Sequence, residues 1–278
     1  MVSRDSGTTP LEQLSQAIRT NILRQIYQAG SGHPGGSLSC ADILAALYGH
    51  ALRGQSVAGS PAARDHLILS KGHAAPALYA ALATQAIIPM EELATLRQLG
   101  SRLQGHPDRS RLPHVEMSTG SLGQGLSVGV GLAWRIKQKG GSGRVYVIVG
   151  DGELDSGQVW EAIMLAGVLR LTNLVAIVDA NEVQNDGSVA SILDIRPYGP
   201  KFTAFGWAAR ELNGHHLAEL TDSLDWSQSS LPGECPRCLI AHTIKGRGVS
   251  FMEGKAEWHS HALSAEQFER AMKEVSGQ

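Results

Sequence analysis

The stretch VYVIVGDGELDSGQVWEA, residues 145–162, is the most informative part of this chain about its fold. It opens with an unbroken apolar run, which is typical of a strand buried on both faces of a parallel sheet. The run ends in Gly-Asp-Gly, and the residues that follow have the spacing of an amphipathic helix. The pattern therefore places one carboxylate, that of Asp151, at the C-terminal end of a buried strand.

On either side of this stretch, strand and helix patterns alternate along the chain. Residues 11–28 have apolar residues at helical spacing and end before Gly30, and Ser264 with Gln267 makes a capping box for a final helix. The predicted strands are residues 144–149, 173–179, 207–211 and 238–243. This order predicts one α/β domain over residues 1–278, with a parallel sheet covered by helices on both faces.

Composition narrows the classes of function. With 42% hydrophobic and 18% charged residues, the chain resembles an ordinary soluble protein. Its longest apolar runs are strand-sized, and the N-terminal MVSRDSGTTP lacks the apolar core of a signal peptide, so we expect a cytoplasmic protein without a membrane segment. A net charge of -2 and the absence of a Lys/Arg block argue against nucleic acid as a partner. Small-molecule chemistry is the better hypothesis.

The three cysteines do not indicate a disulfide framework or a zinc site. Cys235 and Cys238 form a CxxC motif, but the second pair of ligands that a structural zinc site needs is missing. We interpret them as one loop cysteine and one strand cysteine.

The interpretation of Asp151 depends on a second polar residue. Asn181 follows the strand LVAIVDA, and if the two strands are neighbours, a carboxylate and an amide oxygen meet at one edge of the sheet. Such hard oxygen ligands suit Mg²⁺, which completes its octahedron with phosphate oxygens and water, and Gly150 and Gly152 would allow a tight turn and close approach to a phosphate. A lone GDG is more often a helix cap, so the magnesium–diphosphate hypothesis depends on the pairing with Asn181.

Histidines in similar loops support the same site. His33, His73 and His106 each directly follow a glycine in a loop, and His259 lies after the last strand. Imidazoles can donate to phosphate or hydroxyl oxygens and exchange protons near neutral pH. We interpret six further histidines as structural or surface residues: His50, His66, His114, His215, His216 and His242.

Together these motifs resemble a known family. The segments GSGHPGGSLSCADILAALYG, LSKGHAAPALYAAL, GHPD, STGSLGQGLSVGVGLA, GDGEL, DANEVQNDG and TIKGRGVSFMEGKAEWH occur in the order found in the thiamine-diphosphate domain of transketolases. The resemblance covers roughly residues 11–262. It implies the thiamine diphosphate-binding fold (PP domain), with thiamine diphosphate and Mg²⁺ as cofactors and Ca²⁺ or Mn²⁺ as alternative cations.

The resemblance also implies roles for individual residues. Asp151, Asn181 and the main-chain carbonyl of Val183 correspond to the magnesium ligands. His33 and His106 correspond to residues that contact the hydroxyls of the donor sugar, while His73 and His259 reach the diphosphate or line the channel above it; we count all four as catalytic candidates. The implied cofactor-binding set is His73, Gly120, Ser121, Leu122, Gly150, Asp151, Gly152, Glu153, Asn181, Lys245 and His259.

The resemblance implies a partner as well. A full-length transketolase continues into a pyrimidine-binding domain, which supplies the activating glutamate, and then into a third domain; neither follows Gln278. We therefore expect the N-terminal subunit of a split transketolase, silent alone and active in an α2β2 assembly on sugar phosphates. The alternatives are a subunit of an enzyme like 1-deoxyxylulose-5-phosphate synthase, whose substrate pyruvate has no sugar hydroxyls for His33 and His106, and a non-catalytic cofactor-binding subunit.

One position departs from the family pattern. Ser156 stands where transketolases commonly have a glutamate at the subunit interface, near the carboxylates that link two active sites. Asp155 is a candidate substitute although its side chain is expected to point elsewhere, and Glu161 is in its usual place. The departure leaves cofactor binding untouched and puts communication between sites in question.

Overall fold

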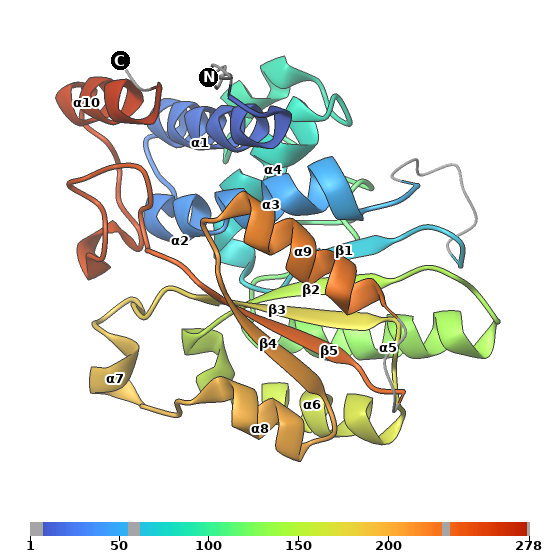
Figure 1. Ribbon diagram of the computed structural model, residues 1–278. Coiled ribbons are helices and arrows are strands. Elements are labelled where there is room, and N and C mark those ends of the chain that lie inside the picture. The colour runs from blue at the N-terminus through green and yellow to red at the C-terminus, as the bar shows by residue number, and fades with distance from the viewer. Residues whose placement is uncertain (1–7, 55–61, 230–233, 277–278) are drawn as a thin grey trace, which may run out of the picture.

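A five-stranded parallel sheet forms the centre of the computed structural model, which describes residues 8–54, 62–229 and 234–276. The strand order is β1-β2-β3-β5-β4 (Figure 1). The strands are β1 (His66–Leu69), β2 (Val145–Gly150), β3 (Leu174–Ala180), β4 (Ala208–Asn213) and β5 (Arg237–His242). Residues 1–7 lie outside the described part. They belong to the N-terminal segment that we interpreted from its sequence as lacking a signal peptide. Among the described helices, none combines the length and apolar character needed to cross a bilayer.

The predicted strands are confirmed to within two residues at each end, and one strand was missed. β1 consists of only four residues, and it pairs with β2 from His66 opposite Val145 to Leu69 opposite Ile148. So short a run, at the edge of the sheet, carries too little pattern to be separated from a loop.

Helices cover both faces of the sheet, as predicted. The α-helices are α1 (Pro10–Ala29), α2 (Pro34–Ser39), α3 (Ala41–Ala46), α4 (Ala75–Thr84), α5 (Gln124–Gln138), α6 (Gly157–Val168), α7 (Val189–Ile192), α8 (Tyr198–Ala204), α9 (Leu217–Gln228) and α10 (Ala265–Ser276). Short 3-10 turns at Gly72–Ala74, Met90–Thr95, Gly152–Asp155 and Ala256–Trp258 and a π-turn at Leu47–Ala51 connect them. Figure 1 shows α1, α3, α4 and α9 on one side of the sheet and α5, α6 and α8 on the other.

The alternation of side chains along β2 explains why the sheet needs both layers. Val145, Val147 and Val149 pack into the core formed with α5 and α6, while Tyr146 and Ile148 pack into the core formed with α1, α3 and α4. All five of these residues are buried, since successive side chains of a strand point to opposite faces. The apolar run of residues 145–149 is therefore a central strand.

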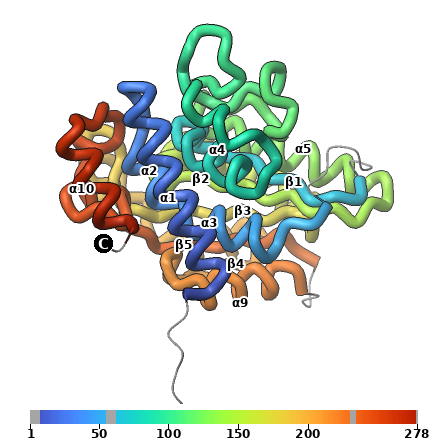
Figure 2. The backbone as a smooth tube through the Cα atoms, turned by 90° about the horizontal axis from the view of Figure 1, so that it is seen from above, coloured from blue at the N-terminus to red at the C-terminus, as the bar shows by residue number. Residues whose placement is uncertain are grey.

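The first and last described helices, α1 and α10, pack against each other. Figure 2 shows α1 and α10 side by side, and the rings of Tyr27 and Phe268 stack with centroids 4.2 Å apart. Gly30 ends α1 with a φ of 61°, and the predicted capping box of α10 is present, with the Gln267 amide N–H donating to Ser264 Oγ at 3.1 Å.

A close backbone contact brings two of the predicted loops together. Gly125, in the first turn of α5, lies so near Ser70 that a Cβ at this position would be 2.5 Å from Ser70 Cβ. Only glycine allows this approach. The loop that leads to His73 is thereby held against the helix that follows Leu122.

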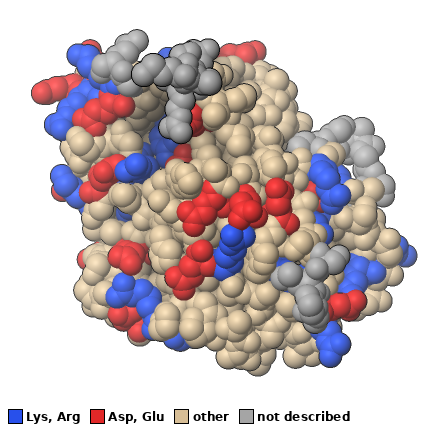
Figure 3. Space-filling view, in the orientation of Figure 1, with Lys and Arg blue, Asp and Glu red and all other residues tan. Residues whose placement is uncertain are grey.

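The two cysteines of the CxxC motif lie as predicted, one in a loop and one in a strand. Cys238 is buried in β5 and Cys235 precedes that strand, and both thiols are free. Acidic and basic side chains both occur across the face in Figure 3. Among the ion pairs of the described residues is that of Arg210 with Asp222 at 2.6 Å.

Candidate active site

A cavity of about 160 Å³ opens beyond the C-terminal ends of β2 and β3. Because Gly150 pairs with Asp179 in neighbouring parallel strands, the residues after each strand come together there, as the sequence predicted. The cavity is lined by these predicted residues: His73, Leu122, Gly150, Asp151, Gly152, Glu153, Asn181, Val183, Lys245 and His259. It is also lined by residues that sequence reasoning missed: Gly36, Lys71, Gln184 and Asn185.

The Asp151 carboxylate is fixed by the main chain. Its oxygens accept from the amide of Gly152 at 2.9 Å and from the amide of Glu182 at 2.5 Å. Burial, and next the charge of Asp179, raise the pKa of Asp151 to about 6. Amide donors set its position while its charge has no direct cationic partner, which is the electrostatic situation of a carboxylate that receives a metal ion.

Oxygen ligands from the loop after β3 accompany this carboxylate. Asn181 is buried and its Oδ1 accepts from the amide of Val183 at 3.2 Å. The carbonyl of Val183 accepts from Lys245 Nζ at 2.9 Å and retains a second lone pair. Within the described ranges no three His, Cys, Asp or Glu side chains form a metal-holding group. The donor set of one carboxylate, one amide and one carbonyl suits a hard cation that also carries phosphate oxygens, with Mg²⁺ as the expected ion and Ca²⁺ or Mn²⁺ as alternatives; it lacks the thiolate and imidazole ligands that Zn²⁺ and Cu²⁺ favour.

The glycine after Asp151 is required by space. A Cβ on Gly152 would lie 2.7 Å from Cγ of Gln184. The chain does turn directly after β2, into the 3-10 turn Gly152–Asp155, although neither Gly150 nor Gly152 is among the described glycines with positive φ. The absence of a Cβ at residue 152 instead leaves the backbone open beside the cavity, as close approach of a phosphate would need.

Glu153 lines the cavity, but its carboxylate is bound by groups of the protein itself. Its carboxylate accepts from the amides of Gly123 at 2.7 Å and Gly150 at 3.1 Å, and from the Ser70 hydroxyl. Burial raises the pKa of Glu153. Its geometry is that of a side chain that ties the loop before α5 to the end of β2.

The predicted histidines form one cluster at the mouth of the cavity. The ring centroid of His33 lies 5.3 Å from that of His73, 5.5 Å from that of His259 and 6.4 Å from that of His106. His73 and His259 are 4.9 Å apart and line the cavity, so they join the cluster to the polar residues below. Four loops far apart in sequence are brought together here.

Two cations determine which ring nitrogens carry protons. Arg97 Nη2 donates to His33 Nδ1 at 3.3 Å, and Lys245 Nζ donates to His259 Nδ1 at 2.9 Å. A guanidinium or ammonium only donates, so both Nδ1 atoms accept and the proton lies on Nε2. Burial first, and then neighbouring positive charge, lower the pKa of His33 to about 4 and that of His259 to about 3. The cluster is therefore neutral at pH 7, and these rings keep Nε2–H donors.

Replacing Arg97 with glutamine is expected to raise the pKa of His33. Burial would still lower it, but the guanidinium charge, the next largest cause, would be gone. An NMR titration of the His33 ring would measure the change, with a half-protonation point at higher pH than in the wild type. Arg102→Gln is the matched control, because that arginine pairs with Glu92 at 2.6 Å; an equal His33 titration in Arg97→Gln and in the control would contradict the assignment.

The loop before α5 provides an apolar wall. Leu122 lines the cavity and is 42% exposed, which leaves its side chain available to an apolar surface of a ligand. Gly120 and Ser121 do not line this cavity; a Cβ on Gly120 would lie 3.3 Å from the ring of His106. Gly120 thus packs beneath the histidine cluster.

At Ser156, the position that departs from the family pattern, Asp155 does not take over the charge of the family's glutamate. Asp155 accepts from Gln184 Nε2 at 2.6 Å, so its carboxylate is held beside a residue of the cavity. Ser156 begins α6 without a side-chain capping bond. Glu161 is exposed on α6, next to the exposed apolar side chains of Met164 and Leu165.

Comparison with known proteins agrees with this site. Residues 11–277 match the family described as transketolase, thiamine diphosphate binding domain. The chain is 40% identical over 269 residues to an apulose-4-phosphate transketolase subunit of Phocaeicola vulgatus, covering 96% of this chain and 94% of that protein. It is also 40% identical over 265 residues to a 6-deoxy-6-sulfo-D-fructose transketolase subunit of Clostridium sp., covering 95% and 96%. The solved transketolase of Campylobacter jejuni superposes with a TM-score of 0.88 at 31% identity, covering 97% of this chain and 43% of that one.

The sheet and its cavity define an α/β cofactor-binding domain. The chain belongs to the transketolase family, whose thiamine diphosphate-binding domain it matches over nearly its whole length. The expected family, fold class and transketolase type of enzyme are therefore confirmed, and the chain spans less than half of the solved transketolase that it resembles.

Proposed function

We propose that this chain is the thiamine diphosphate- and Mg²⁺-binding subunit of a two-chain transketolase. Together with a second subunit it transfers a two-carbon ketol unit from a ketose phosphate to an aldose phosphate. The observation that carries the proposal is the continuity of the site. Oxygen ligands lie at the inner end of the cavity, and a neutral histidine cluster lies at its mouth, with His73 and His259 common to both.

The inner end fits a magnesium diphosphate. Asp151, Asn181 and the Val183 carbonyl would hold the cation, and His259 lies beside them with its Nε2–H as a donor for a phosphate oxygen. Lys245 contributes positive charge, because its three N–H groups already donate to the carbonyls of Val183 and Gln184 and to His259 Nδ1. When bound, thiamine diphosphate supplies the electron sink that cleavage of a ketose carbon–carbon bond requires. The protein holds that group in place and keeps the metal ligands oriented.

The mouth fits a polyhydroxylated substrate. His33 and His106 lie at the outer side of the cluster, and the proton of His33 is on Nε2. Neutral imidazoles can donate to a hydroxyl or accept its proton, which suits the proton transfers that accompany cleavage between hydroxyl-bearing carbons. This preference for hydroxyls favours transketolase over an enzyme that takes pyruvate.

A partner subunit is part of the proposal. Relatives of nearly this length are named as transketolase subunits, and we infer an α2β2 assembly in which the partner supplies the glutamate that activates the pyrimidine ring of the cofactor. The exposed apolar residues Met164, Leu165 and Val168 of α6, beside Glu161, are a candidate contact surface for such an assembly. The isolated chain is then expected to be inactive.

The test is reconstitution. The chain would be mixed with a candidate C-terminal transketolase subunit, thiamine diphosphate and Mg²⁺, and ketol transfer from xylulose 5-phosphate to ribose 5-phosphate would be followed. Apulose 4-phosphate and 6-deoxy-6-sulfofructose are further donors to test, because two relatives are named for them. Turnover of pyruvate with glyceraldehyde 3-phosphate would favour the synthase alternative, and cofactor binding without turnover of any donor would favour the non-catalytic one.

A further inference from the structure

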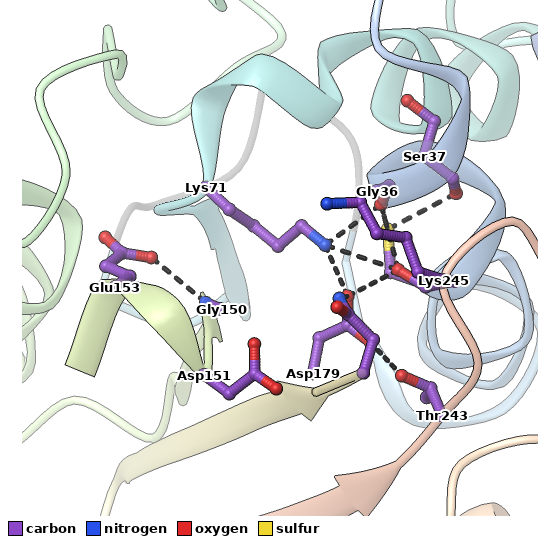
Figure 4. Close-up of polar contacts among 12 residues, drawn as sticks. Gly36, Ser37, Lys71, Gly150, Asp151, Glu153, Asp179, Thr243 and Lys245 are labelled. Atoms are coloured by element: carbon purple, nitrogen blue, oxygen red, sulfur yellow. Dashed lines mark hydrogen bonds and ion pairs between the residues drawn. The ribbon is translucent and has the colours of Figure 1, made fainter. Parts of the chain in front are cut away.

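Asp179 is a fully buried carboxylate at the end of β3, beside the cavity but not lining it. Figure 4 shows it at the centre of a polar group that includes Lys71, Thr243 and Lys245. Its oxygens accept from the Ser39 hydroxyl at 2.6 Å, and from Lys71 Nζ and the Thr243 hydroxyl. The charge is thus compensated by segments that are far apart in sequence.

One further donor to Asp179 is the side-chain amide of Asn181. Asn181 Nδ2 lies 3.2 Å from Asp179 Oδ2, and Asn181 Oδ1 accepts from the Val183 amide, also at 3.2 Å. If the amide were turned over, its oxygen would face a carboxylate and its NH₂ would face an N–H donor. Both contacts therefore select the orientation in which the Asn181 oxygen is available on the Val183 side, where the cation ligands lie.

Lys71 compensates the charge of this carboxylate. Lys71 Nζ contacts Asp179 and also donates to the Gly36 carbonyl at 2.9 Å, and both charged side chains are almost completely buried.

We propose that Asp179 is a positioning residue for the cation site: it holds the Asn181 amide with its oxygen toward the cation, and Lys71 balances its charge. The inference rests on the proposed function, because the cation site is part of it. A carboxylate that only stabilised the fold would need no contact with the Asn181 amide. A carboxylate that orients a ligand has to make that contact, and such partners of metal ligands typically affect metal affinity.

The experiment is calorimetric titration of Mg²⁺, at saturating thiamine diphosphate, into the complex of the full chain with its partner subunit. Asp179→Asn is expected to weaken Mg²⁺ binding by about 10- to 100-fold. Asp65→Asn is the matched control: Asp65 is equally buried and pairs with Arg53 at 3.0 Å, but it lies at the opposite end of the sheet and should leave the affinity unchanged.

A second variant separates orientation from stability. In the double variant Asp179→Asn with Asn181→Asp, the carboxylate at position 181 presents an oxygen in either rotamer, so affinity should return to within about tenfold of the wild type. This variant also keeps an acidic group near Lys71, so it remains informative if Asp179→Asn does not fold.

The outcomes are distinguishable. Wild-type Mg²⁺ affinity in a folded Asp179→Asn complex, or a folded double variant that binds no better than Asp179→Asn or not at all, would overturn the positioning role. If the wild-type complex itself bound neither Mg²⁺ nor thiamine diphosphate, the proposed function would fail and this inference with it.

Discussion

Asp151→Ala is expected to abolish measurable binding of Mg²⁺ and thiamine diphosphate, a loss of at least about a hundredfold in affinity. The substitution removes the carboxylate that would contact the metal, and it leaves the amides of Gly152 and Glu182 pointing into the cavity, where they favour negative charge and oppose a cation. Isothermal titration of the complex with the cofactor would measure the loss. Asp194→Ala, which removes an exposed carboxylate paired with Arg196, is the control and should bind as the wild type does.

At Asp151, cofactor affinity and the stability of the free protein are expected to respond differently to substitution. Burial and the charge of Asp179 raise the pKa of Asp151 to about 6, so near pH 7 the ionised Asp151 destabilises the folded protein when no cation is present. Asp151→Asn keeps the shape and removes the charge. It should therefore weaken cofactor binding without lowering the Tm of the free protein, and unchanged cofactor affinity in either Asp151 variant would refute the ligand assignment.

The sequence predicted the fold best where a strand is buried along its length on both faces. The run of β2, and that of β3 up to Val178, is apolar because the central strands pack against helices on both faces, and the ends of both strands were predicted closely. Polar residues that directly follow parallel neighbours lie at the same edge of a sheet. The sequence therefore predicted that Asp151 and Asn181 converge if their strands are neighbours, and the pairing of β2 with β3 meets that condition.

The charges that support the site were not predictable in this way. Asp179 lies inside the run LVAIVDA, where an apolar pattern describes its neighbours and gives no sign of its partners. Those partners, Ser39, Lys71 and Thr243, come from loops whose distances only the fold determines. Lys71 stands two residues before His73 in the motif LSKGH, but that spacing does not predict its burial.

The sequence pattern indicated where the histidines lie but not which ring nitrogen carries the proton. A glycine before His33, His73 and His106 marked three loops as similar, His259 followed the last strand, and the structure brings all four rings to one place. The Nε2 protons of His33 and His259 follow from contacts with Arg97 and Lys245, which no spacing rule relates to them. Sequence therefore located the cluster, and tertiary contacts determined its protonation.

His106→Ala is expected to lower kcat/KM for ketol transfer in the reconstituted complex by about a hundredfold or more, as loss of a proton-transferring or hydroxyl-binding imidazole does. Cofactor affinity should be unchanged, because His106 does not line the cavity and its ring lies 6.4 Å from that of His33 at the outer side of the cluster. Steady-state kinetics with the natural donor, together with titration of the cofactor, would measure both quantities.

The matched control is His114→Ala, a histidine of the same long loop that was interpreted as structural and makes no ring contact with the cluster among the described residues. It should leave kcat/KM close to that of the wild type. Full activity in His106→Ala would remove the catalytic assignment, and an equal loss of activity and cofactor affinity would move His106 from the substrate to the cofactor. Only loss of activity with retained cofactor binding would support the proposed role of His106, contact with the substrate and not with the cofactor.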